Sequence, residues 1–195
     1  GTPVNARIPE TATRTLANGV RVIVAPNRAL PLISADLRIA SGGSADPRGR
    51  AGLASMTGDL LTRGTTTRSA TEIASQIESL GAGIESGAGV DSSAVSLQTR
   101  SDRVQEAFTV FADVARNPAF AQEEIDRAKQ EALDGLQVAL SQPGSIGGLA
   151  MTRAIYGDAP YGAIASASSI SAITRDDMAN YHAAYWRPDN AVLVI

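Results

Sequence analysis

Several residue types that commonly build catalytic centres are absent or rare in this chain of 195 residues. It contains no cysteine, which excludes disulfide bonds, thiolate metal sites and a cysteine nucleophile. Its only histidine is His182, so a zinc site with two histidine ligands cannot form within the chain. His182 follows Tyr181 and precedes Tyr185 in an aromatic-rich segment, and we expect it to be structural or exposed rather than catalytic.

Long apolar runs and clusters of basic residues are also missing. No segment approaches the roughly 20 apolar residues of a membrane-spanning helix, so no membrane span is expected. The net charge is −3 without a basic run, which disfavours a nucleic-acid partner. Apolar residues make up 44% and charged residues 19%, which is typical of a folded globular domain.

The first third of the chain has the pattern of β-structure. Asn18-Gly19 favours a tight turn between strands at 13–16 and 20–24. Apolar and polar residues then alternate over 33–39, which predicts a strand with one buried face. We expect residues 1–12 to be an N-terminal extension. The chain closes on the apolar segment 191–195, which reads as a buried strand, so we expect a fragment of a longer protein, truncated at its C-terminus.

Helical periodicity dominates the rest. Leu53, Met56 and Leu60 share one helical face, and Ser69 with Glu72 forms a capping box at the start of the next helix. Further helices are predicted over residues 104–114, 125–140, 146–155 and 174–186, with strands at 94–99 and 191–195. This order predicts an α+β fold, with helices on one face of an antiparallel sheet, as a single domain over residues 13–195.

Common motifs of catalysis and cofactor binding are not found. No nucleophile elbow, P-loop or EF-hand spacing occurs. The segment GAGIESGAG at 81–89 superficially resembles a dinucleotide-binding fingerprint, but its spacing differs and it leads from a helix to a strand. We therefore interpret it as a glycine-rich turn at a helix end.

Arg14 to Ile195 resembles the first domain of the pitrilysin/insulinase family of zinc metallopeptidases, which includes the mitochondrial processing peptidases. The matching segments follow the family order; they include LANGVRVIVAPNRALPLISADLRIASGGSADP, GLASMTGDLLTRGT, SATEIASQIESLGAGIES, EEIDRAKQEALDGL and ITRDDMANYHAAYWRPDNAVLVI. The resemblance implies the fold of the family's metallohydrolase domains.

Active members carry the motif H-x-x-E-H on a helix, where two histidines bind zinc and the glutamate is the general base. The resemblance places Ser55 and Asp59 at the two histidines and Gly58 at the base. It places Gly135 at the third ligand, a glutamate in active members. Because one carboxylate falls short of the three protein ligands of a catalytic zinc, we expect no zinc and no hydrolysis in this domain.

The resemblance implies a partner for such a degenerate domain. We expect a non-catalytic half that supplies chamber wall and substrate contacts to a homologous zinc-bearing half, in the same chain or a separate subunit. The assembled protein would then be a zinc metalloendopeptidase acting on peptides. The alternative is a scaffold without a peptidase partner, like the core subunits of respiratory complexes; an enzyme built on Asp59 is the least favoured reading. Fused bacterial members of the family suggest the periplasm or envelope as location.

Overall fold

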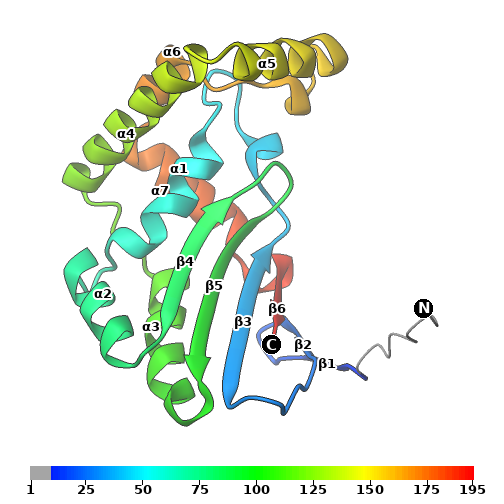
Figure 1. The fold of residues 1–195 in the computed structure, drawn as a ribbon, viewed down its shortest axis with the longest axis vertical. Helices are drawn as coiled ribbons and strands as arrows, with labels where there is room; N and C mark the ends of the chain where they lie inside the picture. The colour runs from blue at the N-terminus through cyan, green and yellow to red at the C-terminus, as the bar shows by residue number, and fades with distance from the viewer. Residues whose placement is uncertain (1–9) are drawn as a thin grey trace, which may run out of the picture.

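A computed structural model describes residues 10–195 as a six-stranded sheet with helices packed against one face (Figure 1). The strands are β1 (Ala12–Thr15), β2 (Arg21–Val24), β3 (Leu32–Ile39), β4 (Gly83–Ala88), β5 (Ser93–Arg100) and β6 (Ala191–Val194). They lie in the order β1-β2-β6-β3-β5-β4, so β1 and β4 form the two edges. The predicted extension, residues 1–12, lies mostly outside the described residues, and β1 includes its last residue.

The predicted α+β class is confirmed, but the sheet is not wholly antiparallel. The final strand β6 lies between β2 and β3 and runs parallel to β2. All other neighbouring strands are antiparallel. A parallel pair needs a long crossover between its strands, and here the crossover comprises nearly the whole domain.

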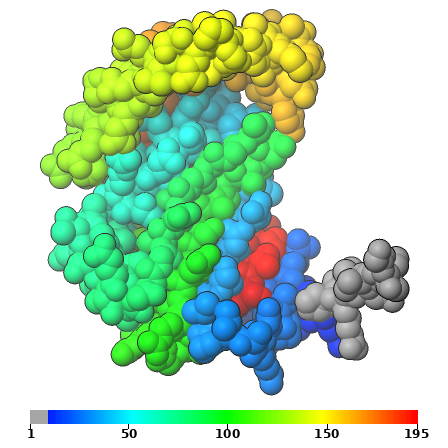
Figure 2. Space-filling view, in the orientation of Figure 1, coloured from blue at the N-terminus to red at the C-terminus, as the bar shows by residue number. Residues whose placement is uncertain are grey.

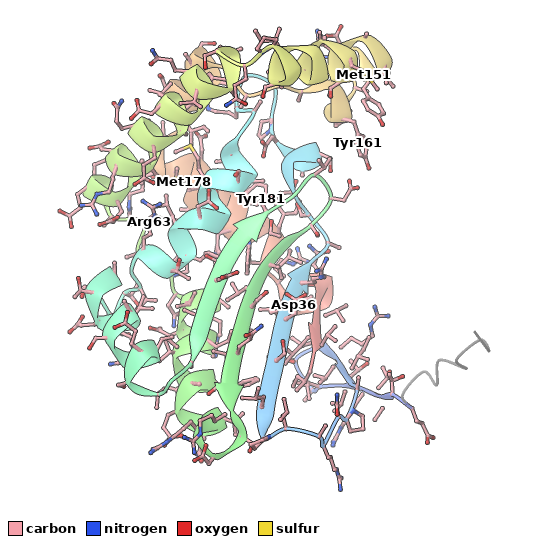
Figure 3. All side chains as sticks on the ribbon, in the orientation of Figure 1. Asp36, Arg63, Met151, Tyr161, Met178 and Tyr181 are labelled. Carbon is pink, nitrogen blue, oxygen red and sulfur yellow. The ribbon has the colours of Figure 1, made fainter. Side chains whose placement is uncertain are left out.

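Alternation along the strands gives the sheet two different faces. Ala35 and Leu37 of β3 pair with Leu97 and Val95 of β5, and these side chains pack towards the helices. The residues between them, such as Asp36, belong to the opposite face. There Asp36 accepts hydrogen bonds from Arg38 at 2.9 Å and Ser96 at 3.1 Å (Figure 3). The sheet therefore has one face covered by helices and one polar face.

Seven α-helices occur in the described residues. They are α1 (Leu53–Leu60), α2 (Ala70–Ser79), α3 (Val104–Arg116), α4 (Gln122–Leu140), α5 (Pro143–Tyr156), α6 (Ala167–Ala172) and α7 (Arg175–Tyr185). The capping box predicted at Ser69 and Glu72 begins α2, and Thr174 with Asp177 forms another at α7. The short helix α6 escaped prediction, because six residues give too little periodicity to recognise.

The hydrophobic core lies between the sheet and helices α1, α2, α3 and α7. Leu53, Met56 and Leu60, the face predicted for α1, are all buried. Six of the eight α1 residues are buried, so this helix occupies the centre of the domain. Close packing on its buried faces holds such a helix in a fixed position.

The segment 81–89 corrects the sequence analysis. Residues Gly83–Ala88 form the edge strand β4 rather than a turn. The glycine content indicated a turn because glycine is disfavoured in strands. Glycine does occur in strands, however, where another backbone approaches closely. Gly87 stands at such an approach, described below.

His182 on α7 has a structural environment. Its Nε2–H donates to the backbone carbonyl of Ala115 on α3 at 3.0 Å, and its ring stacks on that of Trp186. Burial lowers the pKa of His182, and the hydrogen bond to Ala115 opposes this only in part. The neutral imidazole therefore links α7 to α3.

Candidate functional site

Helix α1 is positioned at its start by a side chain from the preceding loop. The carboxylate of Asp46 accepts hydrogen bonds from the backbone N–H groups of Gly52 at 2.8 Å and Ala54 at 2.9 Å. These are groups that the helix itself leaves unpaired. Burial raises the pKa of Asp46, while the backbone hydrogen bonds act in the opposite direction. Asp46 thus fixes where α1 begins and how it is rotated.

Ser55 and Asp59 lie one turn apart on the exposed side of α1. The structure therefore brings together the two positions that the family resemblance assigns to histidine ligands. Burial raises the pKa of the Asp59 carboxyl, and Arg63 and the Ser55 hydroxyl oppose the rise. One carboxylate and one hydroxyl are a poor donor set for zinc.

Gly58, at the position that the family resemblance assigns to the general base, faces the backbone of β4. A Cβ placed on Gly58 would lie 2.6 Å from the carbonyl carbon of Gly87 and 2.9 Å from its Cα. Contacts this short with backbone atoms do not occur without a shift of one element. Gly58 therefore does more than omit a carboxylate, because its lack of a side chain lets α1 pack directly on β4.

Gly135, at the position that the family resemblance assigns to the third ligand, has the opposite surroundings. It is exposed on α4, and a Cβ there would meet no atom within 4 Å. The structure therefore has room for a side chain at Gly135 but not at Gly58.

An ion pair joins the turn that follows α1 to the middle of α4, and sequence reasoning missed it. Arg63, in the 3₁₀ turn Leu61–Arg63 after α1, binds Glu131 of α4 through two hydrogen bonds of 2.6 and 3.2 Å. Glu131 precedes Gly135 by one helical turn. The hydrogen bond to Arg63 lowers the pKa of Glu131. Arg63 is labelled in Figure 3.

Arg63 could have been noticed because it lies four residues after Asp59, within reach of its charge. Glu131 gave no such signal, because its partner lies 68 residues away. Arg63 thus lies within reach of two carboxylates, those of Asp59 on α1 and Glu131 on α4. Among residues 10–195, no three His, Asp or Glu side chains are grouped so that they could hold a metal ion.

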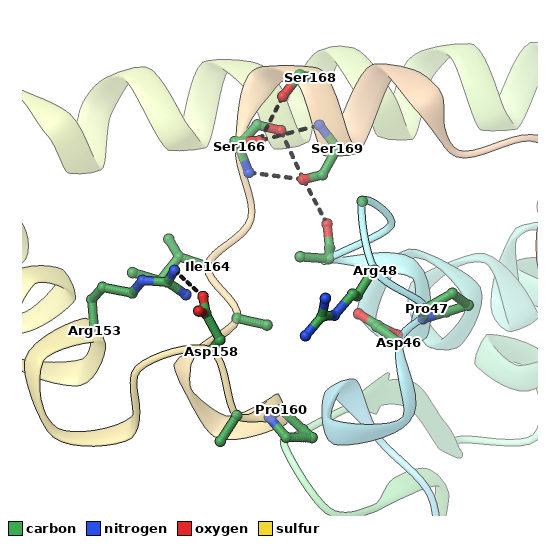
Figure 4. A pocket seen from close by; sticks show the side chains of 14 residues that line it. Asp46, Pro47, Arg48, Arg153, Asp158, Pro160, Ile164, Ser166, Ser168 and Ser169 are labelled. Carbon is green, nitrogen blue, oxygen red and sulfur yellow. Dashed lines mark hydrogen bonds and ion pairs between the residues drawn. The ribbon is translucent and has the colours of Figure 1, made fainter.

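A pocket of about 820 Å³ lies beside the start of α1, between the loop 46–51 and the segment that links α5 to α6 (Figure 4). Arg153 and Asp158 form an ion pair at its edge. Ser169 donates to the carbonyl of Ala51 at 2.9 Å across the pocket wall.

The edge strand β4 borders the α1 site. It pairs only with β5 among the described strands, so its second edge has no neighbouring strand. An edge of this kind can receive an extended peptide as an added strand. None of the helices in the described part of the chain has the length and apolar character needed to cross a membrane.

Comparison with known proteins agrees with this geometry. The model of the insulinase family, peptidase family M16, matches residues 21–184. An uncharacterized zinc protease of Rickettsia bellii is 23% identical over 182 residues, covering 92% of this chain and 44% of its own. A probable mitochondrial-processing peptidase subunit beta of Arabidopsis thaliana is 22% identical, covering 95% of this chain and 35% of its own.

A solved structure matches more closely in sequence. The crystal structure of an inactive domain of an M16 peptidase from Pseudomonas fluorescens is 30% identical, with a TM-score of 0.89, and the match covers 95% of this chain and 46% of the other. The present chain therefore spans less than half the length of these relatives. With a family match over most of its residues and the same fold, the chain belongs to the insulinase family, peptidase family M16.

Proposed function

We propose that this domain is the non-catalytic half of an M16 zinc peptidase, forming chamber wall and substrate contacts for a zinc-bearing half that hydrolyses peptides. The observation that carries the proposal is the contact between Gly58 and Gly87, because β4 occupies the space that a catalytic glutamate would need. Ser55, Asp59 and Gly135 do not fit a zinc ion as a ligand set, so we derive no catalytic step through zinc in this domain.

Two further observations support the proposal. The relative from Pseudomonas fluorescens, 30% identical, is itself described as an inactive domain. The relatives are more than twice as long as this chain, which leaves room in each for a second domain of similar size. In the proposed role, the polar face of the sheet around Asp36 lines the chamber, and the open edge of β4 receives the peptide.

The test measures zinc and peptide hydrolysis in this domain and in its partner half. We expect less than about 0.1 zinc per chain here and about one in a half that carries H-x-x-E-H, as a catalytic zinc requires a full ligand set. Hydrolysis of an unfolded peptide should need both halves. The control replaces the glutamate of the partner's H-x-x-E-H by glutamine, which should abolish activity without removing the assembly.

One tightly held zinc in this domain alone would contradict the proposal. Absence of any H-x-x-E-H sequence in the same or the neighbouring gene would favour the scaffold function instead. Activity of this domain that is lost in Asp59→Asn would indicate an enzyme built on the α1 site.

A further inference from the structure

Helix α5 has an apolar surface that nothing in the described residues covers. None of its 14 residues is buried, and Arg153 is its only charged residue. Ile146, Met151 and Ile155 are 46%, 64% and 61% exposed. With 100° between successive residues, the arc from Ile146 to Ile155 spans half the circumference and contains only Pro, Gly, Ala, Ile and Met.

The surface continues beyond α5. Of the twelve large hydrophobic residues that are exposed in residues 10–195, seven lie between positions 138 and 161, which is far more than an even distribution would give. We call these seven the α5 surface: Val138, Leu140, Ile146, Met151, Ile155, Tyr156 and Tyr161. Figure 2 shows this part of the chain, in yellow, as the upper end of the molecule. Exposed apolar residues concentrated in one part of the chain, with Ile146, Met151 and Ile155 on one face of α5, favour an interaction site over ordinary surface.

The position of α5 is fixed, so the surface is already formed. The hydroxyl of Tyr161, in the 3₁₀ turn Pro160–Gly162, donates to Asp91 in the β4–β5 connection at 2.6 Å. Arg153 donates to the carbonyl of Gly157 at 2.7 Å and pairs with Asp158. The Tyr161 contact ties the turn after α5 to the β4–β5 connection, and the Arg153 contacts tie α5 to the segment that leads into this turn, while the apolar arc of α5 makes none of them.

We propose that the α5 surface is where the companion half of the peptidase docks. This inference rests on the proposed function, since it names the contact surface for the partner given there. The part of each relative that lies outside the match is longer than this chain. A 14-residue helix is about 21 Å long, which suits an interface between domains of ordinary size.

The composition of the surface argues for a protein partner that stays in place. It has the apolar centre and the aromatic residues that are enriched in the buried part of interfaces, with Arg153 and Asp158 at its rim. A companion half in the same assembly meets this surface at a high effective concentration, which a second copy in dilute solution does not.

The experiment compares two cysteine variants of the complete assembled protein, Met151→Cys and Leu30→Cys. Both parent residues have the same exposure in this domain, 64% and 65%, and Leu30 lies outside the α5 surface. Reaction with a maleimide is followed by mass spectrometry of the peptide that carries each site. We expect Met151→Cys to react at least about tenfold more slowly, because labelling requires local opening of the interface. Ile155→Cys serves as a second probe if Met151→Cys does not fold.

Equal labelling rates at both sites would overturn the inference. Protection of Met151→Cys that disappears on dilution while peptide hydrolysis per molecule is unchanged would also overturn it, since the two halves would still be assembled and the cover would then be a second copy of the chain. Protection that is lost together with hydrolysis supports it, because both then follow separation of the halves. Protection that survives dilution supports it. If labelling is equal but both halves are still needed for hydrolysis, only the docking surface is wrong and the proposed function stands. If zinc is found in this domain, the proposed function fails whatever the labelling shows.

Discussion

Helices α1 and α5 are similar in composition but have opposite surroundings. Each is rich in apolar residues and carries a single charged residue, Asp59 in α1 and Arg153 in α5. Six of the eight α1 residues are buried, whereas none of the fourteen α5 residues is. Figure 1 shows α1 among the other elements and α5 at the upper end of the molecule. Apolar composition therefore serves the internal core in one helix and an external contact in the other.

The largest effect should come from removing a side chain at the centre of α1. Leu60 is 1% exposed and Met151 of α5 is 64% exposed. Leu60→Ala should lower the free energy of unfolding by about 2–5 kcal/mol, because it leaves a cavity in the core. Met151→Ala should change it by less than about 0.5 kcal/mol in the 195-residue chain. Urea unfolding measures both, and similar values for the two would break the comparison between the helices.

A smaller effect should separate Gly58 and Gly135, the two glycines that the family resemblance places at the general base and the third ligand. Gly58→Ala should destabilise the chain by about 1–3 kcal/mol, because the new methyl group meets the backbone of Gly87. Gly135→Ala should stabilise it by about 0.5–1 kcal/mol, since alanine favours the helix and the site is open. Thermal or urea unfolding of the pair is the measurement. If Gly58→Ala were stabilising, β4 would have to move away from the new methyl group at little cost in free energy.

The smallest effect concerns the link between α7 and α3. Burial lowers the folded-state pKa of His182, so the unfolded chain binds a proton more readily near its ordinary pKa of about 6.5. Stability is therefore full above that pKa and should fall as the pH is lowered from about 7 to 5.5, by at most about 1.4 kcal/mol per unit. His182 is the only histidine, which isolates its contribution in this window.

The control for this pH effect is His182→Gln, which keeps a donor for the Ala115 carbonyl but does not titrate. Its stability should not depend on pH between 5.5 and 7. If the wild-type chain were equally stable at pH 7 and pH 5.5, His182 would take up a proton as easily in the folded chain as in the unfolded chain.

Sequence patterns predicted much of the body of the fold. The buried face of α1 and the capping box of α2 follow from local spacing, and both are confirmed. The position of β6 beside β2 could not be predicted from the sequence, because strand order depends on contacts between distant residues. For β4, glycine content indicated a turn, since nothing local revealed that Gly87 lies against Gly58.

The candidate site was predicted as a set of positions but not as a structure. Ser55 and Asp59 lie together as their spacing of four residues requires. The pairing of Arg63 with Glu131 could not be predicted, because it joins residues far apart in the chain. The assignment of zinc-ligand positions to Ser55, Asp59 and Gly135 stays a prediction from family resemblance.

The contact between Gly58 and Gly87 also bears on how the domain could be engineered. Histidines at positions 55 and 59 and a glutamate at 135 could be introduced by substitution alone, because those positions are exposed. A glutamate at position 58 could not, since its first carbon would overlap the strand beside it. A design that places the complete family motif on α1 therefore has to move β4 as well as change the helix.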